Sequence, residues 1–574
     1  MAETLISPGV LARENDISFI APSAIEAGAA IIGPAVKGPV EIPTKVTSYG
    51  QYQNIFGTTF TSGSTKQEFL TSIAVKSYFN QGGNSVIVTR VVNGSFTAAD
   101  STPITAGVGA APFVLNTLGK GTIYNSSGSA NSDGSLVNGS PDNIRFEVVN
   151  VDNTSGTFGL LVRRGDDNLK NKIVLETWND LSLDPNSEGY IESVIGNQYK
   201  SKANDGTQYY VNTVGEYVNK SNYITVKQDS VRQTLDYLGN DGLIRVAAST
   251  GSLPTAQIGA FVSATGVNVS ATQVQNKYFG DIADAGSQGL IGSDYANAIS
   301  ILGNQDEYVF NIVSAPGLLY EFGTHKIQLD SIISLAESRG DNIAVVDLQN
   351  YGANVTDATG TAKTVNSSYA ASYWPWLQTQ SATGKNEWIP ASVVIPGVYA
   401  FTDGAAAPWF APAGLTRGGL GNVIQAERKL TRTQRDTLYS ANVNPIATFP
   451  GSGISVFGQK TLQKKKSALD RVNVRRLLIE LKKFLGDTAK TLVFEQNTIA
   501  TRNSFLATVT PFLESVVQRQ GLYAFRVVMD DSNNTSDTID RNQLIGQVFI
   551  QPAKTVEFVV LDFTIEPTGA TFSA

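Results

Sequence analysis

The chain has 574 residues, of which 41% are hydrophobic, and a formal net charge of −7 at pH 7. It has no cysteine, which excludes disulfides, thiolate metal sites and thiol nucleophiles. Its one histidine, His325, would have to serve any Ser-His-Asp triad or His-bearing metal site. The length predicts roughly three or four domains.

The first 94 residues read as an arm followed by the start of an α/β domain. Residues 1–22 contain a Ser-Pro-Gly turn and no helical periodicity, which indicates an extended N-terminal arm. Strand-like residues 28–48, helical segments at 48–57 and 65–83, and a buried strand at 85–92 follow. We find no apolar run of signal-peptide or membrane-span length, so we expect a soluble product made in a cytoplasm.

Residues 95–245 are rich in Gly, Ser, Asn and Thr, with strand-like islands, which predicts an inserted, mostly β domain. The α/β pattern then resumes with a strand at 307–318, a helix at 325–340 and a strand at 342–348. These alternating elements predict parallel pairing, so residues 23–94 and 246–385 form one α/β middle domain. His325 begins the helix, where we expect a surface or capping role.

The last part, residues 386–574, carries helical patterns at 425–441, 470–486 and 500–521, then strands at 522–531 and 543–567. The glycine-rich segment 416–423 lacks the Lys-Ser/Thr of a phosphate loop, and the acidic segment 530–542 lacks the Gly and Glu of a calcium loop. We therefore expect neither an enzymatic activity nor a cofactor.

The helical pattern at 470–486 has a basic side. Val474, Leu477, Leu478, Leu481 and Leu485 form a narrow apolar stripe, with Asp470 placed to cap the helix and Gly486 to end it. The predicted outer arc carries four basic residues: Arg475, Arg476, Lys482 and Lys483.

Residues 417–490 hold fifteen Lys or Arg and five acidic residues, a net charge of +10, so the rest of the chain carries −17. A charged helix face is usually only solvated, but this polarity indicates a surface for an acidic partner.

Several long motifs resemble the contractile tail sheath proteins of myovirus-type, T4-like bacteriophages. The N-terminal ones are LISPGV at 5–10, GPAVKGPVEIPTKVTSYGQYQNIFG at 33–57 and SYFNQGGNSVIVTRVV at 77–92. The C-terminal ones are DGAAAPWFAPAGLTRGGLGNV at 403–423, QRDTLYSANVNPI at 434–446, SALDRVNVRRLLIELKK at 467–483 and DRNQLIGQVFIQPAKTVEFVVLDF at 540–563.

The resemblance implies a multidomain α/β (α+β) fold with a sheath core built from both chain ends, a variable outer domain, and terminal arms that add strands to neighbouring subunits. By position, the N-terminal arm strand would include Leu5, Ile6, Val10 and Ile17. The C-terminal arm strand would include Val556, Phe558, Val559, Val560, Leu561 and Phe563.

The resemblance also implies a structural subunit that polymerises helically, six per ring, around a tail tube and contracts to drive the tube through the host envelope. Its partners would be copies of itself and the tube, baseplate and tail terminator proteins, with neither direct nucleic-acid contact nor membrane insertion. It would belong to the virion tail and be assembled in the host cytoplasm. We hypothesise that an acidic tube surface meets Lys464, Lys465, Lys466, Arg471, Arg475, Arg476, Lys482 and Lys483.

The main alternative is the sheath of a prophage-derived bacteriocin or another contractile injection system. A nucleic-acid-binding protein would use the basic region and show salt-sensitive DNA retention, but the overall acidity and few aromatic residues among the basic ones argue against it. An acidic-residue hydrolase in the inserted domain would show a metal-dependent activity.

Overall fold

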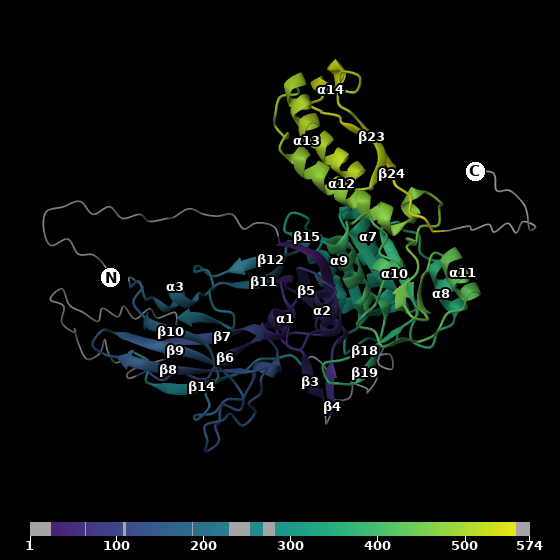
Figure 1. The fold of residues 1–574 in the computed structure, drawn as a ribbon. Coiled ribbons are helices and arrows are strands. Elements are labelled where there is room, and N and C mark those ends of the chain that lie inside the picture. The colour runs from purple at the N-terminus through teal and green to yellow at the C-terminus, as the bar shows by residue number, and fades with distance from the viewer. Residues whose placement is uncertain are drawn as a thin grey trace, which may run out of the picture.

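Figure 1 shows the fold in a computed structural model, which describes residues 25–62, 65–106, 111–185, 187–228, 253–267 and 282–557. The predicted N-terminal arm, including Leu5, Ile6, Val10 and Ile17, lies outside these ranges. Of the helices within them, none combines the length and the apolar character that a membrane crossing needs.

A central sheet of eight strands organises the molecule, in the order β2-β5-β1-β15-β16-β17-β21-β22. The strands are β1 (Ile25–Gly33), β2 (Thr44–Val46), β5 (Val86–Arg90), β15 (Tyr308–Leu319), β16 (Ile343–Asp347), β17 (Ala370–Trp374), β21 (Asn444–Phe449) and β22 (Gly453–Val456). The six strands from β5 to β21 pair in parallel, and β2 and β22 are antiparallel edges. The predicted parallel α/β arrangement is therefore confirmed, but the sheet extends past the predicted boundary at residue 385.

Helices cover both faces of this sheet, because its strands are apolar on both sides. On β1, Ala29 and Ile31 point into one core and Ala30 and Ile32 into the other. The first core is closed by α2 (Leu70–Asn80), α9 (Ile395–Ala405) and the short α1 (Tyr49–Phe56). The second is closed by α6 (Ala296–Ile301), α7 (Gly323–Arg339), α8 (Val355–Ala362) and α11 (Arg432–Ser440).

His325 lies in the first turns of α7, but the predicted surface or capping role is wrong. Its side chain is fully buried, and its Nδ1 accepts a hydrogen bond from the Leu319 backbone nitrogen at 3.3 Å. The burial lowers the pKa of His325, although the nearby Asp284 opposes that change. The residue therefore holds the turn after β15 onto α7 and is not accessible to a substrate.

A second, β-rich domain is inserted between β5 and β15 and lies beside the central sheet (Figure 1). Its seven-stranded sheet has the order β10-β9-β8-β14-β6-β7-β13. These strands are β6 (Ala98–Ser101), β7 (Phe113–Lys120), β8 (Ile144–Asp152), β9 (Thr157–Arg164), β10 (Val174–Ser182), β13 (Ile224–Gln228) and β14 (Gln257–Val262). The domain also contains α3 (Ile191–Ile195) and a hairpin of β11 (Tyr199–Asn204) and β12 (Tyr209–Val214). Because β14 belongs to this sheet, the domain extends past the predicted boundary at residue 245.

The inserted domain is fastened to the central domain by charged contacts. The buried Arg90, the last residue of β5, donates hydrogen bonds from Nη1 to the carbonyl oxygens of Gly38 at 2.5 Å and Lys120 at 2.9 Å. Lys37 pairs with Asp142 at 3.4 Å. The insertion is thus held at its first strands as well as by its chain connections.

A C-terminal lobe projects from the central domain in Figure 1. It consists of α12 (Val472–Lys490), α13 (Ile499–Gln518), β23 (Leu522–Val528), α14 (Ser536–Asp540) and β24 (Gln547–Pro552). Its core includes Leu477 and Leu481 of α12 and Val509, Leu513 and Val516 of α13. The apolar stripe predicted for α12 is therefore confirmed.

Both predicted ends of α12 are wrong. Asp470 lies in a short turn before the helix and pairs with Arg471 at 2.9 Å, and the helix continues through Gly486 to Lys490. Stacking of Phe484 on Phe512 of α13, with ring centroids 3.7 Å apart, ties this part of α12 to the lobe. Tertiary packing therefore overrides the low helix propensity of the glycine.

Smaller elements complete the fold. They are the hairpin of β3 (Thr59–Ser62) and β4 (Thr65–Glu68), the sheet of β18 (Leu377–Gln380), β19 (Asn386–Ile389) and β20 (Gln425–Ala426), and the short α10 (Gly414–Arg417).

Candidate functional site: a basic surface and an open hairpin

The eight basic residues predicted to meet an acidic partner fall into two groups. Lys464, Lys465, Lys466 and Lys482 are exposed and Lys483 is half-buried, whereas Arg471 is half-buried and Arg475 and Arg476 are each only 4% exposed. The prediction that Arg475 and Arg476 lie on an outer face is therefore wrong. The reason is that α12 serves two cores, since Val472 and Ile479 pack into the central domain while the opposite stripe packs into the lobe.

Arg476 is paired inside the protein. Its Nη2 lies 2.6 and 2.5 Å from the two carboxylate oxygens of Asp403, at the end of α9, and its guanidinium lies over the ring of Tyr399 at 4.7 Å. A planar guanidinium can make both contacts together. This residue therefore joins α12 to α9 and is not available to another protein.

Arg475 is also directed inward. It donates to the Ser368 hydroxyl and lies over the ring of Tyr369 at 4.0 Å, and burial lowers its pKa while Tyr369 and Glu337 oppose that change. A charge reversal at Arg475, which the sequence alone would suggest as a surface test, would therefore bury an unpaired acid and damage the fold.

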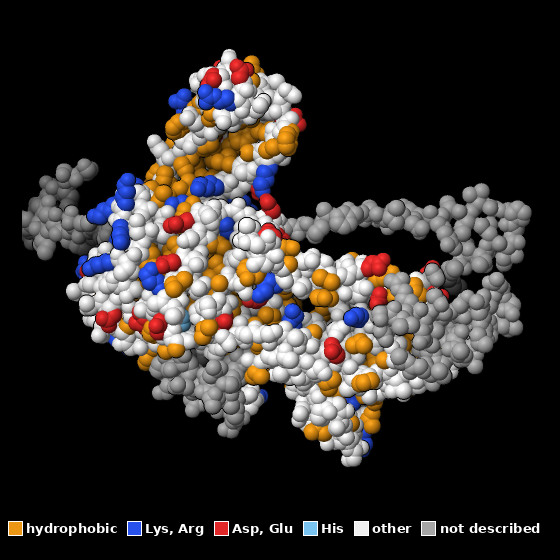
Figure 2. All heavy atoms as spheres, turned by 180° about the vertical axis from the view of Figure 1, so that it is seen from behind, with side chains coloured by type: hydrophobic (Ala, Val, Ile, Leu, Met, Phe, Trp, Pro, Cys, Tyr) orange, Lys and Arg blue, Asp and Glu red, His pale blue; other side chains and the backbone are white. Residues whose placement is uncertain are grey.

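Two of the exposed lysines, Lys464 and Lys482, lie beside one loop, residues 366–369, between α8 and β17. The backbone nitrogen of Lys464 donates to Asn366 at 2.9 Å, and the Lys482 Nζ donates to the Tyr369 hydroxyl at 3.2 Å. Three further basic residues next to α8 and α11 are exposed: Lys363, Lys429 and Arg432. Figure 2 shows several Lys and Arg side chains on the central domain near the base of the lobe.

Within the described ranges, none of the five lysines at 464–466, 482 and 483 forms an ion pair with an acidic residue of this chain. On a molecule whose net charge is −7, such a surface is suited to an acidic partner. We call it the basic surface, defined by these five lysines.

The hairpin of β23 and β24 offers a second surface. Its two strands pair only with each other among the residues that the structure covers, so both outer edges carry unpaired backbone groups. Tyr523 and Phe549 are exposed on it, and Figure 2 shows hydrophobic side chains over the lobe. An isolated two-stranded ribbon gains stability when further strands are added.

Of the residues named for the predicted C-terminal arm strand, only Val556 lies within the described ranges. Val556 is 81% exposed and lies outside the strands, after β24 has ended. Phe558, Val559, Val560, Leu561 and Phe563 lie outside the described residues.

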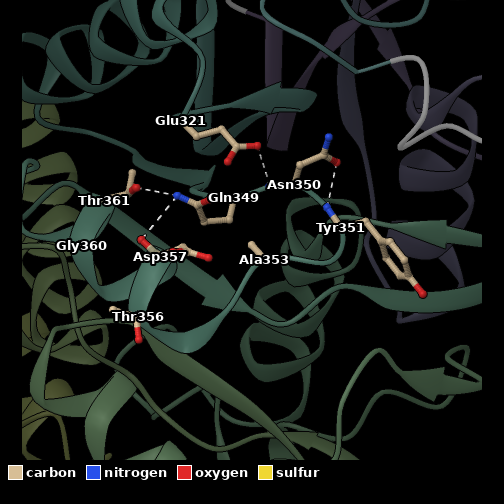
Figure 3. Close-up of a pocket in the computed structure, with 9 residues that line it drawn as sticks. All are labelled: Glu321, Gln349, Asn350, Tyr351, Ala353, Thr356, Asp357, Gly360 and Thr361. Atoms are coloured by element: carbon tan, nitrogen blue, oxygen red, sulfur yellow. Dashed lines mark hydrogen bonds between the residues drawn. The ribbon is translucent and has the colours of Figure 1, made fainter.

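A hollow of about 640 Å³ opens at the carboxyl ends of β15 and β16 (Figure 3). Residues that line it form hydrogen bonds with one another: Gln349 donates to the Thr361 hydroxyl at 2.5 Å, and Glu321 accepts from the Asn350 backbone nitrogen at 3.0 Å. In the part of the chain described, no three His, Cys, Asp or Glu side chains are grouped as metal ligands. The hollow therefore assembles neither a nucleophile with its base nor a metal centre.

Asp347 at the end of β16 provides a test of stability against pH. It is buried and accepts hydrogen bonds from Ser392, at 3.0 Å from the nitrogen and 2.5 Å from the hydroxyl, but burial dominates and raises its pKa to about 7. In the unfolded chain the pKa is about 3.9, so the folded protein binds the proton more tightly. The free energy of unfolding should fall as pH rises from about 4 to about 7, then level off.

We expect Asp347→Asn to remove this dependence and to be more stable than the parent at pH 8 by about 2–4 kcal/mol, with little difference at pH 4. Urea unfolding at several pH values measures it. Parallel stability curves for the two proteins would contradict the expectation.

Comparison with known proteins gives two family matches. The family model for the phage tail sheath protein central domain matches residues 288–462, and that for the phage tail sheath C-terminal domain matches residues 464–566. The first match crosses residue 385, as the central sheet does.

Two curated relatives are tail sheath proteins. That of Vibrio phage KVP40 is 35% identical over 245 residues, covering 42% of this chain and 36% of the relative. That of Enterobacteria phage T4 is 38% identical over 187 residues, covering 33% of this chain and 28% of the relative. These alignments span only about a third of either relative.

The crystal structure of a sheath tail protein from Listeria innocua is similar in fold. It aligns with a TM-score of 0.54 and 11% identity over 92% of this chain and 96% of that chain.

Proposed function

Since residues 288–462 and 464–566 belong to the phage tail sheath family, we propose that this chain is the structural subunit of a contractile tail sheath. It polymerises helically as stacked rings around a tail tube and contracts to drive the tube through the host envelope. The observation that carries the proposal is the presence of both sheath domains, in order, on a chain whose fold is similar to that of a sheath tail protein.

The role is mechanical rather than enzymatic. The partners are further copies of this chain, six per ring, the tail tube protein, and the baseplate and terminator proteins at the ends. The protein belongs to the virion tail and is assembled in the host cytoplasm. Contraction is a rigid-body rearrangement of subunits that repacks their lateral contacts.

Subunits are joined by strand addition at the β23–β24 hairpin. Two open edges on one hairpin accept strands from terminal arms of neighbouring copies, and backbone hydrogen bonds supply the join. Such contacts are heterologous and do not close on themselves, so they generate a helical array.

The basic surface faces the tube. Each exposed ion pair contributes only about 0–1 kcal/mol, so a single contact releases easily. Repetition over many subunits makes the whole attachment firm while leaving it able to let go during contraction.

Charge reversal of the exposed lysines tests this contact. The triple variant Lys464→Glu, Lys465→Glu and Lys466→Glu should melt within about 2 °C of the parent, since surface substitutions change stability little. It should sediment with purified tubes at least about tenfold less at physiological salt, because three attractive contacts per subunit become repulsive.

The matched control reverses three exposed lysines of the β-rich domain: Lys170→Glu, Lys200→Glu and Lys227→Glu. It carries the same change in net charge and should assemble as the parent does. Equal assembly of the two triple variants would contradict the proposed orientation of the basic surface.

Electron microscopy of the purified chain, beside a version lacking residues 1–20, tests the function itself. Hollow striated cylinders are expected from the full chain, with or without added tubes, and only monomers from the truncated one. A full-length chain that stays monomeric at every salt concentration, even when tubes are present, would overturn the proposal.

A further inference from the structure

After β24 the chain crosses from the lobe to the central domain in the five residues 553–557. Ala553 still donates its backbone N–H to the Gly521 carbonyl at 3.1 Å, beside β23. Beyond it, Lys554 and Val556 are exposed while Thr555 and Glu557 are half-buried. This alternation is that of an extended strap with one side turned toward the protein.

The carboxylate of Glu557 accepts hydrogen bonds from two side chains, those of Arg471 and Gln459. Arg471 donates to it from Nε at 2.7 Å and from Nη2 at 2.9 Å, one bond to each oxygen. The side-chain amide of Gln459 donates to the same carboxylate at 3.1 Å and to the Thr555 hydroxyl at 2.5 Å. A two-bond arginine contact of this kind fixes orientation as well as distance.

The site collects residues from separate parts of the central domain and the lobe. Gln459 follows β22 and Arg471 precedes α12, while Tyr439 of α11 lies under the Arg471 guanidinium at 5.9 Å. Burial favours a higher pKa for Glu557, but its hydrogen bonds to Arg471 and Gln459 outweigh it and lower the pKa. The carboxylate is therefore ionised at neutral pH, and Arg471 is already engaged.

We propose that Glu557 is an anchor that fixes where the C-terminal segment leaves the protein. Without it, the last contact of the described chain would be that of Ala553 with Gly521, beside β23 of the lobe. With it, the chain is held as far as Glu557, at a site that Gln459 and Arg471 form. Arg471, predicted from the sequence to face the tube, is a positioning residue for this segment.

The consequence for assembly rests on the proposed function. In a sheath, a C-terminal segment that starts from a fixed point on the central domain is presented to the copy that lies against that point. The anchor thereby selects which copy receives the segment.

Limited proteolysis of the free chain tests the anchor directly. Endoproteinase Lys-C cleaves after Lys554, and intact-mass spectrometry follows the loss of residues 555–574. We expect Glu557→Gln and Arg471→Met each to speed this cleavage by about tenfold or more, because cleavage reports how often the strap opens and a charged hydrogen bond is worth about that factor.

The double variant Glu557→Gln/Arg471→Met should be cleaved no faster than the faster single variant, since both remove the same contact. Glu495→Gln, an exposed acid on the lobe, is the matched control and should be cleaved at the parent rate. If Glu557→Gln is also cleaved at the parent rate, the anchor is overturned.

Hydrogen exchange of the amides of Thr555, Val556 and Glu557 gives a second readout that does not depend on a protease. Faster exchange in Glu557→Gln than in the parent supports the anchor, and equal exchange overturns it. Both measurements use the unassembled chain, so they stand even if that chain fails to form cylinders, a result that would overturn only the proposed function.

Discussion

Replacing Asp167 by Asn is expected to destabilise the β-rich domain by about 3–5 kcal/mol. Asp167 is fully buried between two fully buried arginines and accepts from Arg163 Nε at 2.6 Å and lies 3.3 Å from Arg145 Nη1. Glu147 shares Arg163 at 2.8 Å and also binds Lys172 at 2.7 Å, so it cannot neutralise both arginines. Neutralising Asp167 therefore leaves buried positive charge without a partner.

Hydrogen exchange of peptides from β8 and β9 measures this effect within the domain. Asp166→Asn, at the next residue, is the matched control because Asp166 pairs at 2.5 Å with an Arg164 that is 37% exposed. An exposed pair contributes at most about 1 kcal/mol, so the control should change protection little. Equal losses in the two variants would mean that the buried cluster contributes no more than a surface pair.

Replacing Arg476 by Met is expected to cost about 2–4 kcal/mol of global stability. The methionine keeps the apolar stem over Tyr399, but Asp403 loses the only cation in contact with it among the described residues. Asp403 is 27% exposed, so water offsets part of the loss and the value falls below that of a fully buried pair.

Urea unfolding of the whole chain measures the change. The matched control on the same helix is Lys490→Met, whose pair with Asp487 is 71% and 61% exposed on its two side chains and should contribute at most about 0.5 kcal/mol. The double variant Arg476→Met/Asp403→Leu should recover part of the loss, since it leaves no unpaired charge. A single variant as stable as the control would show that Arg476 behaves as a surface residue after all.

Local patterns in the sequence were sufficient to predict several of the longest elements of the central domain and the lobe. Apolar runs predict the buried strands β5, β15 and β16, and helical periodicity predicts α7 and α12. These patterns show that a segment is buried, whichever segment it packs against. Parallel pairing followed from the alternation of strands and helices.

Local sequence patterns could not predict the contacts between distant segments. The partners of Arg476 and Arg471 are Asp403 and Glu557, 73 and 86 residues away, so the charge pattern of α12 alone could not reveal that these arginines are engaged. Likewise β21 joins the sheet beside β17, and β14 beside β8, across long intervening segments, so composition placed the domain boundaries too early. The five lysines of the basic surface, in contrast, form no ion pair with an acidic residue of the described ranges, and their role stays a prediction.

The way the β-rich domain is inserted bears on how such a chain can change over evolution. Its entry and exit segments lie side by side, since the backbone nitrogen of Thr97 donates to the Thr265 carbonyl at 3.2 Å and the two side-chain hydroxyls lie 3.1 Å apart. A short turn, or a foreign domain with closely spaced termini, could join these segments without altering the sheet. We therefore expect the β-rich domain to be an exchangeable module, open to rapid diversification or to the display of other proteins, while the central sheet stays unchanged.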